Sequence, residues 1–228
     1  MKICVSVMAE NVQAAKAKMK KAFSLADMVE LRIDRIGSEK LDALLQSKEG
    51  TILITNRKKE EGGFFKGSEE ERIAVLKRAV SLGVDIVDIE LSSGEAVISE
   101  IACHIKDAGA RTKLLVSYHN FNGTPSDRLL RNKAEACARA GGDMIKIVTL
   151  ADSMDDNLRI LKLIPDCHKK GNDVVAFCMG DAGRISRVAA PLFGAPFTFA
   201  SLEKGSESAP GQMTVQELKS IFELLQGK

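Results

Sequence analysis

The sequence has few aromatic residues and almost no net charge. It contains no tryptophan, one tyrosine and three histidines in 228 residues, and 33 basic side chains face 31 acidic ones for a formal net charge of +2. Proteins that bind nucleic acid or a membrane surface usually carry a marked basic excess, and single-stranded nucleic acid also needs aromatic stacking platforms. We therefore expect neither nucleic acid nor a membrane among its partners.

Paired cysteines and long apolar runs are also missing. The five cysteines are odd in number and no two have the CxxC spacing, which argues against a disulfide framework and against a zinc site. The N-terminal stretch MKICVSVMAENVQ is apolar for only about six residues, too few for a signal peptide or a membrane span. We expect reduced, mostly buried thiols, no metal ion and a cytoplasmic location.

Short β-branched runs, each followed by a stretch of helical periodicity, recur along the whole chain. Strand followed by helix, repeated eight times without a linker, indicates a parallel sheet, and eight units in 228 residues fit a compact (βα)8 TIM barrel of the α/β class. The rival is an open, doubly wound sheet, but SVMAEN after the first run lacks its GxGxxG turn. We predict a single barrel domain over residues 1–228. The expected strands are 3–7, 28–33, 51–57, 84–91, 112–119, 144–150, 173–179 and 197–201.

A barrel requires its chemistry at the C-terminal ends of the strands. The polar side chains that interrupt the apolar runs do fall late in them, with one lysine lying inside its run. These residues are Ser6, Glu30, Arg32, Arg57, Glu90, His119 and Lys146.

Lys146 is unusual because it lies within the apolar run MIKIVTL. Strand alternation places it on one face with Met144 and Val148, opposite the face formed by Ile145 and Ile147. Either the lysine extends outward to water, or it points into the barrel mouth. We favour the inward orientation, because a desolvated amine loses its proton more readily and can then form a Schiff base with a carbonyl.

The other polar candidates each allow a structural interpretation. His119, at the end of its run, is either a hydrogen-bonded structural residue or an acid/base group. Glu30 and Arg32 share one side of their strand, as an ion pair or as a clamp for hydroxyl groups. Arg57 ends its run, and Glu61 follows in a polar, glycine-ended segment that the residues alone favour as a solvated loop.

Two loops near the C-terminus remain ambiguous from their residues. GDAGRISR, 180–187, has glycines ahead of a helix and two arginines three positions apart, which would suit a phosphate site. SESAPGQ, 206–212, consists of common loop-forming residues and says little alone. His104 and His168 are expected to lie outside any site.

Taken together, six motifs in this order resemble the type I 3-dehydroquinate dehydratases, and the similarity runs nearly from end to end. The motifs are ELRID, TNR followed by EGG, SYHNF, MIKI, GRISR and SAPGQ. The resemblance implies the dehydration of 3-dehydroquinate to 3-dehydroshikimate in the shikimate pathway, with no metal or cofactor. It also implies a small-molecule substrate as the partner, and we expect a homodimer as the assembly.

The resemblance assigns a role to each matching residue. Lys146 would form the imine, His119 would act as general acid/base, and Glu61 would orient the histidine. The remaining matches concern substrate binding: Glu30, Arg32 and Arg57 for ring hydroxyls, Arg187 with Ser208 and Gln212 for the carboxylate, Phe121, Met179 and Phe199 for the apolar wall, and Ser6 near the pocket.

Two positions depart from the family pattern, and two rival functions remain. Phe177 stands where the resemblance leads us to expect a methionine, and the loop between Phe199 and Ser208 is about two residues longer than the pattern.

A Schiff-base aldolase acting on a phosphorylated sugar would use GDAGRISR for phosphate. A barrel that only binds a small acid would have no reactive lysine.

Overall fold

The computed structural model describes residues 1–37 and 40–227. Its strands form one sheet of eight, all pairs parallel, and helices surround the sheet. The strands are β1 (Ile3–Val7), β2 (Met28–Arg32), β3 (Thr51–Thr55), β4 (Ile86–Glu90), β5 (Lys113–Asn120), β6 (Met144–Leu150), β7 (Asp173–Met179) and β8 (Thr198–Ser201). The helices are α1 (Val12–Leu25), α2 (Leu41–Leu45), α3 (Glu69–Ser81), α4 (Glu95–Asp107), α5 (Asp127–Arg139), α6 (Met154–His168), α7 (Arg184–Ala189) and α8 (Val215–Leu225).

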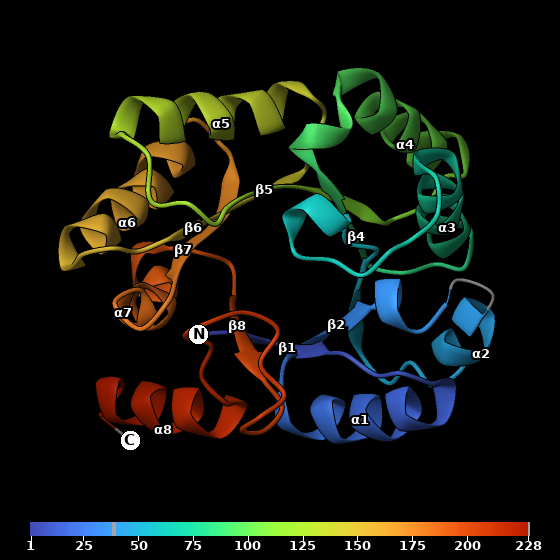
Figure 1. Ribbon diagram of the computed structural model, residues 1–228, viewed down its shortest axis with the longest axis horizontal. Coiled ribbons are helices and arrows are strands. Elements are labelled where there is room, and N and C mark those ends of the chain that lie inside the picture. The colour runs from blue at the N-terminus through green and yellow to red at the C-terminus, as the bar shows by residue number, and fades with distance from the viewer. Residues whose placement is uncertain (38–39, 228) are drawn as a thin grey trace.

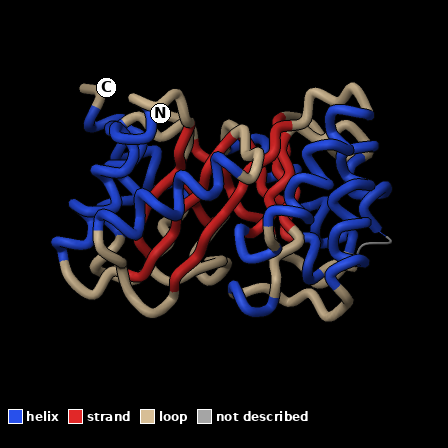
Figure 2. The backbone as a smooth tube through the Cα atoms, turned by 90° about the horizontal axis from the view of Figure 1, so that it is seen from above, coloured by secondary structure: helices blue, strands red, loops and turns tan. Residues whose placement is uncertain are grey.

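The arrangement is a (βα)8 barrel, as the sequence predicts. Strands fill the centre and helices lie outside them in both views (Figures 1 and 2). The strand order is β7-β6-β5-β4-β3-β2-β1-β8, so strands β1 to β7 pair with their neighbours in sequence and β8 pairs with β1. No ladder joins the two ends of this order, β7 and β8, both of which the structure describes. Side chains, and not backbone hydrogen bonds, therefore close the barrel at that seam.

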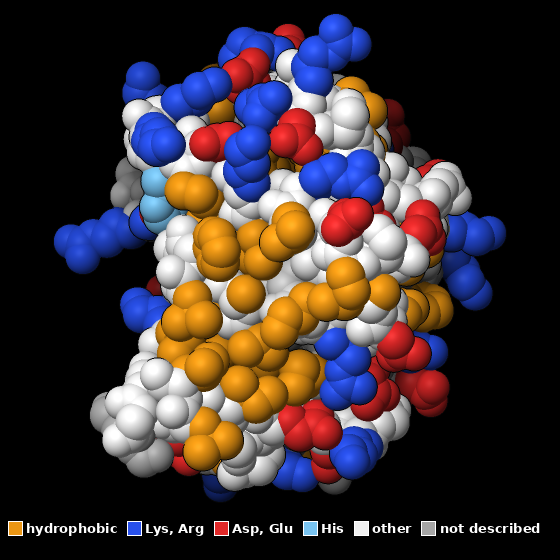
Figure 3. Space-filling view, turned by 90° about the vertical axis from the view of Figure 1, so that its left-hand side faces the viewer, with side chains coloured by type: hydrophobic (Ala, Val, Ile, Leu, Met, Phe, Trp, Pro, Cys, Tyr) orange, Lys and Arg blue, Asp and Glu red, His pale blue; other side chains and the backbone are white. Residues whose placement is uncertain are grey.

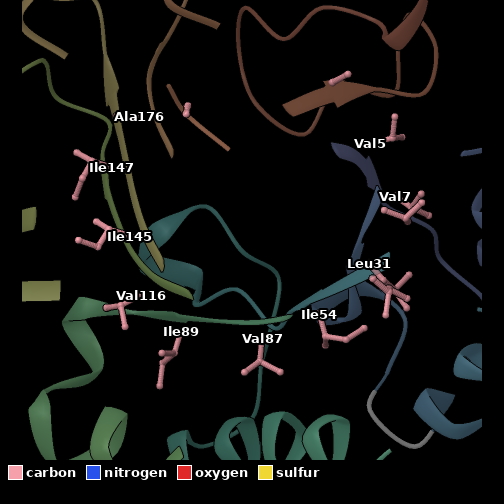
Figure 4. Packing of buried hydrophobic residues seen from close by; sticks show 14 of the residues in the cluster. Val5, Val7, Leu31, Ile54, Val87, Ile89, Val116, Ile145, Ile147 and Ala176 are labelled. Carbon is pink, nitrogen blue, oxygen red and sulfur yellow. The ribbon is translucent and has the colours of Figure 1, made fainter. Parts of the chain in front are cut away.

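Strand alternation divides the apolar side chains into two cores. One set points outward and packs against the helices, as Val87, Ile89 and Val116 do in Figure 4. A second, smaller set fills the barrel interior and includes Leu53 and Leu115. Because both faces of each strand are covered, the strands read as continuous β-branched runs in the sequence.

Aspartates ahead of alternate strands secure the N-terminal face of the barrel. Asp27, Asp85 and Asp143 each accept a backbone N–H at the start of β1, β3 and β5, at 2.8 Å. These bonds satisfy amides that begin a buried strand and would otherwise lack a partner. Polar side chains also gather at the opposite, C-terminal face, where Arg57 pairs with Asp88 and Glu90.

No helix in residues 1–37 and 40–227 is both long and apolar enough to cross a membrane.

Candidate active site

A cavity opens at the C-terminal ends of the strands. Every residue that the sequence analysis assigned to a site lines it. These residues are Ser6, Glu30, Arg32, Arg57, Glu61, His119, Phe121, Lys146, Met179, Arg187, Phe199, Ser208 and Gln212. Gly62, Val148, Phe177, Ala209 and Pro210 complete the lining.

Lys146 points into this cavity from β6, so the inward orientation is the one found. Its side chain is buried, and its Nζ lies 3.4 Å from Asp88 Oδ2 and 3.7 Å from Glu30 Oε1. The ammonium also sits over the ring of Phe199, 4.2 Å from the centroid. Two carboxylates and an aromatic face therefore hold one amine at the floor of the cavity, where a carbonyl carbon can approach it.

His119 lies on β5, the strand next to Lys146, and pairs with a carboxylate from a loop. Its Nδ1 is 2.8 Å from Glu61 Oε2, and Ser92 Oγ donates to the other oxygen of Glu61 at 2.6 Å. Because the carboxylate accepts a hydrogen bond from Nδ1–H, we assign the basic lone pair to Nε2. The solvated-loop interpretation of Glu61 is therefore wrong, since its side chain is only 10% exposed.

A short 3-10 turn, η3 (Lys59–Glu61), aims Glu61 at the histidine. Gly62 ends the turn with a φ of 77°, and a Cβ on Gly63 would lie 1.9 Å from the carbonyl oxygen of Arg57. The two glycines let the chain fold back against the end of β3. The sequence shows the glycines but not His119 as the long-range partner of Glu61, so the residues alone favour a solvated loop.

The surroundings of His119 favour its neutral form. Burial lowers the pKa of His119 well below 6.5, and the charges of Arg57 and Lys146 lower it further against the opposing effect of Asp88. Burial also raises the pKa of Glu61, although the hydrogen bond from Ser92 and the charge of Arg57 oppose that change. At neutral pH the imidazole can therefore accept a proton.

Arg57 belongs to a buried ion-pair network that the sequence analysis largely missed. It donates to Asp88 at 2.6 Å and to Glu90 and Ser117 at 2.8 Å each. Burial alone would raise the pKa of Asp88, but the charges of Arg57 and Lys146 outweigh burial and hold that pKa far below its usual range. The alternation of acidic residues in VDIVDIEL was the available signal, since Asp88 and Glu90 share the inward face.

Glu30 and Arg32 are also held in fixed positions, but not by each other. Glu30 accepts hydrogen bonds from Ser6 at 2.6 Å and from Thr55 at 2.8 Å, whereas Arg32 makes a two-pronged contact with Asp34 at 2.8 Å. Burial would raise the pKa of Glu30, yet the charges of Lys146 and Arg32 and the Ser6 bond together keep it below 4.5. The carboxylate is therefore ionised beside the lysine.

Arg187 supplies the charge on the opposite side of the cavity. One guanidinium nitrogen donates to the carbonyl oxygen of Pro210 at 3.2 Å, and burial lowers the pKa of Arg187 to about 10. Gln212 Oε1 accepts from the backbone N–H of Ser208 at 2.7 Å, which folds this loop over the same end. Arg184, the other arginine of GDAGRISR, is exposed and absent from the lining, so this segment presents one cation and not a phosphate nest.

Apolar side chains form the remaining wall. Met179 and Phe199 are buried, whereas Phe121 is 42% exposed at the rim and stacks on His119 with ring centroids 6.5 Å apart. His104 and His168 lie outside the lining. Among the described residues no group of three His, Cys, Asp or Glu side chains could hold a metal ion.

Comparison with known proteins places this cavity in a family. The model of the family described as type I 3-dehydroquinase matches residues 3–228. The chain belongs to the type I 3-dehydroquinase family. Two relatives are named 3-dehydroquinate dehydratase. The one from Thermococcus gammatolerans is 39% identical over 97% of this chain and 98% of its own length. The one from Desulfotalea psychrophila is 35% identical over 97% of this chain and 96% of its own length. The crystal structure of 3-dehydroquinate dehydratase from Geobacillus kaustophilus superposes with a TM-score of 0.90 at 27% identity, covering 99% of this chain and 91% of that one.

Membership in the 3-dehydroquinase family decides between the functional classes considered above. The family is one of hydro-lyases, so the chain is an enzyme of that class. The alternatives of a phosphosugar aldolase and of a barrel that only binds a small acid are therefore wrong.

Proposed function

We propose that this enzyme removes water from 3-dehydroquinate, in the shikimate pathway, through a Schiff base on Lys146, with His119 as the general acid/base. The observation that carries the proposal is the placement of a buried amine and a neutral, carboxylate-paired imidazole on adjacent strands. Lys146 pairs in register with Ser117 and Val148 with His119, so the lysine and the histidine belong to neighbouring positions of β6 and β5.

The first step joins the amine to the substrate ketone. Lys146 attacks the carbonyl carbon in its uncharged form, and loss of one water molecule gives a protonated imine. Asp88 and Glu30 stay ionised and stabilise the positive charge that the nitrogen carries in the protonated imine. The iminium then withdraws electrons from the neighbouring carbon and makes its hydrogen acidic.

His119 carries out the elimination. Its Nε2 takes the proton from the carbon next to the imine, and the electron pair forms an enamine. When the hydroxyl group one carbon further on departs, the same imidazolium returns that proton, so the leaving group is water. Glu61 keeps Nδ1 protonated and the ring aimed throughout. Water then hydrolyses the imine, releasing the unsaturated ketone and restoring Lys146.

The remaining lining binds the substrate. Arg187 suits the carboxylate because a guanidinium fork can donate two parallel hydrogen bonds, and Ser208 and Gln212 lie at the same end. Glu30, Arg32 and Arg57 face the ring hydroxyls, with Ser6 beside Glu30. Phe121, Met179 and Phe199 cover the carbon skeleton. No metal or cofactor takes part in these steps.

A direct assay tests the reaction. The product has a carbonyl conjugated to a double bond and the substrate does not, so absorbance in the enone band should rise when 3-dehydroquinate is added. The same absorbance in a Lys146→Ala control should stay flat. If the wild-type protein gives no rise either, the proposed reaction is wrong.

We also infer that the chain forms a homodimer through an apolar face. Figure 3 shows hydrophobic side chains gathered over the side of the molecule that carries α6, α7 and α8. The large exposed ones lie on these helices and on the turn η5 (Ala190–Phe193). They are Met154, Leu158, Ile185, Leu192, Phe193, Leu224 and Leu225.

A second copy of the chain suits this face. A contiguous group of exposed apolar side chains marks an interaction surface, and in a two-fold dimer the same face of each copy covers the other. Sedimentation should give the mass of a dimer. Leu158→Glu should dissociate it, whereas Leu129→Glu, on α5 outside this face, should not. A monomer at every concentration contradicts this assembly.

A further inference from the structure

Arg187 differs from the other buried arginines in the described part of the chain. Arg32, Arg57 and Arg72 each have a carboxylate oxygen within 3 Å, at 2.8, 2.6 and 2.7 Å. Arg187 is just as buried, yet among the described residues its guanidinium makes one hydrogen bond, to the carbonyl oxygen of Pro210, and its Nε has no partner. No carboxylate of the described residues therefore neutralises this guanidinium.

The aromatic ring of Phe177 lies against the guanidinium of Arg187. The Cζ of Arg187 lies over this ring, 4.5 Å from the centroid. The negative face of the ring attracts the cation, and the attraction is strongest where water is excluded. A guanidinium that stacks on a ring uses its flat face, which leaves the N–H groups at its edge to bind a ligand.

Phe177 is itself fixed by a second ring that contacts the other cation of the cavity. The centroids of Phe177 and Phe199 are 5.9 Å apart, across the seam where β7 and β8 have no ladder. Lys146 Nζ lies 4.2 Å from the Phe199 centroid, so two touching rings connect Arg187 to Lys146. Phe197 packs edge-on against Phe199 from the other side, at 5.4 Å.

We propose that Phe177 is a positioning residue for substrate binding, which fixes the plane of the Arg187 guanidinium and, with Phe199, the separation between that guanidinium and Lys146. The inference rests on the proposed function, in which Arg187 binds the carboxylate and Lys146 the ketone carbon of one small ring. It goes further by naming the side chains that match the enzyme to the spacing of those two groups.

The chemical nature of residue 177 matters for this role. Leucine would fill much of the same space but offers no electron-rich ring face to the guanidinium. The side chain of Arg187 could then rotate about its own bonds. The loss falls on the binding of the carboxylate, because Lys146 and His119 keep their contacts with Asp88 and Glu61. KM should therefore change more than kcat, whereas damage to the fold would lower the amount of active enzyme and with it the apparent kcat.

Steady-state kinetics of Phe177→Leu and Phe197→Leu test the proposal. Both changes remove the same atoms from the same aromatic cluster, and both residues are 3% exposed, but among the described rings the Arg187 guanidinium lies over Phe177 alone. We expect KM to rise about 3- to 30-fold for Phe177→Leu, the range of a desolvated cation–π contact, and less than about 2-fold for Phe197→Leu. Equal KM values for wild type and Phe177→Leu, or equal increases in both variants, overturn the proposal.

A double-mutant cycle shows whether Phe177 acts through Arg187. In an Arg187→Met background the cation is absent, so Phe177→Leu should produce little further loss of kcat/KM. Losses of equal size with and without Arg187 contradict a positioning role. If Phe177→Leu does not fold, Phe177→Met, whose unbranched and flexible side chain can fill the gap without an aromatic ring, takes its place with the same criteria.

The outcomes separate this inference from the function on which it rests. A wild-type protein without dehydratase activity contradicts the proposed function itself. An active wild type whose KM is unchanged by the Phe177 variants contradicts only the role of Phe177.

Discussion

The charged residues of the cavity divide by whether their charge is already paired. Arg57 is paired with Asp88 and Glu90, whereas Arg187 has no carboxylate partner among the described residues. A buried cation that lacks an anion gains more from an anionic ligand than one that is already neutralised. We therefore expect Arg187 to contribute most to recognition of the carboxylate, and Arg57 to set the electrostatic field around Lys146.

Replacing Arg187 by lysine tests this distinction. Arg187→Lys keeps the positive charge but loses the planar fork, so binding should weaken by about 1–3 kcal/mol. We expect a higher KM and a smaller change in kcat, measured with 3-dehydroquinate in the absorbance assay. Unchanged values of both constants would remove Arg187 from the site.

The pH dependence of kcat/KM should follow His119. A base must be unprotonated to act, and burial together with the charges of Arg57 and Lys146 holds the pKa of His119 below 6.5. As pH falls, activity should therefore persist through about 6.5, the pKa of an ordinary histidine, and decline only below it. An apparent pKa of 6.5 or above for the acidic limb of the kcat/KM profile contradicts this assignment of His119 as the base. Stability should fall in the same acidic range, because the unfolded chain takes up this proton first.

At the scale of an element, the turn η3 decides how Glu61 reaches His119. Glu60 and Glu61 are neighbours on this turn, but Glu60 is exposed and Glu61 is hydrogen-bonded to the imidazole. Glu61→Gln should lower kcat about 10- to 100-fold, since the histidine loses the charge that stabilises its protonated form. Glu60→Gln, an identical change one residue earlier, should leave kcat unaltered. Similar kcat values for the two variants would show that η3 only closes a loop.

Much of each element could be predicted from the chain itself. The β-branched runs located all eight strands, and alternation within MIKIVTL placed Lys146 inside the barrel. The expected strand 51–57 was too long, because β3 ends at Thr55 and the chain then turns back through Gly62 and Gly63. That turn depends on contacts with Arg57 and His119, which no local pattern reveals.

At the scale of the whole molecule, the fold could be predicted but the pairing of charges could not. Eight repeats without a nucleotide-binding turn left few topologies, and the polar strand ends then had to share one rim. Which carboxylate meets which cation depends on barrel register, so Asp88 was not foreseen as the neighbour of Lys146. The roles of the residues around the cavity remain predictions.

We expect the whole enzyme to need no metal ion, and this expectation can be tested directly. The proposed steps need only protons and an amine, and no cluster of metal ligands occurs among the described residues. Incubation with EDTA followed by removal of the chelator should leave kcat unchanged. Loss of activity that a divalent cation restores would show that the cofactor-free mechanism is wrong.

The central claim is that Lys146 and His119 act in sequence on one covalently bound substrate. Reduction with borohydride should therefore fix the substrate on Lys146 of the wild-type enzyme. His119→Ala retains the amine, so an adduct should still form, while the elimination step slows by about 10²–10⁴-fold. Because both groups act on one intermediate, their losses should not add in the double variant.

Mass spectrometry of the reduced protein is the most direct measurement. We expect one added substrate-derived mass in wild type and in His119→Ala, located by peptide mapping on Lys146, and none in Lys146→Ala. An adduct on Lys146→Ala protein, or one mapped to any other lysine, would contradict a Schiff base on Lys146.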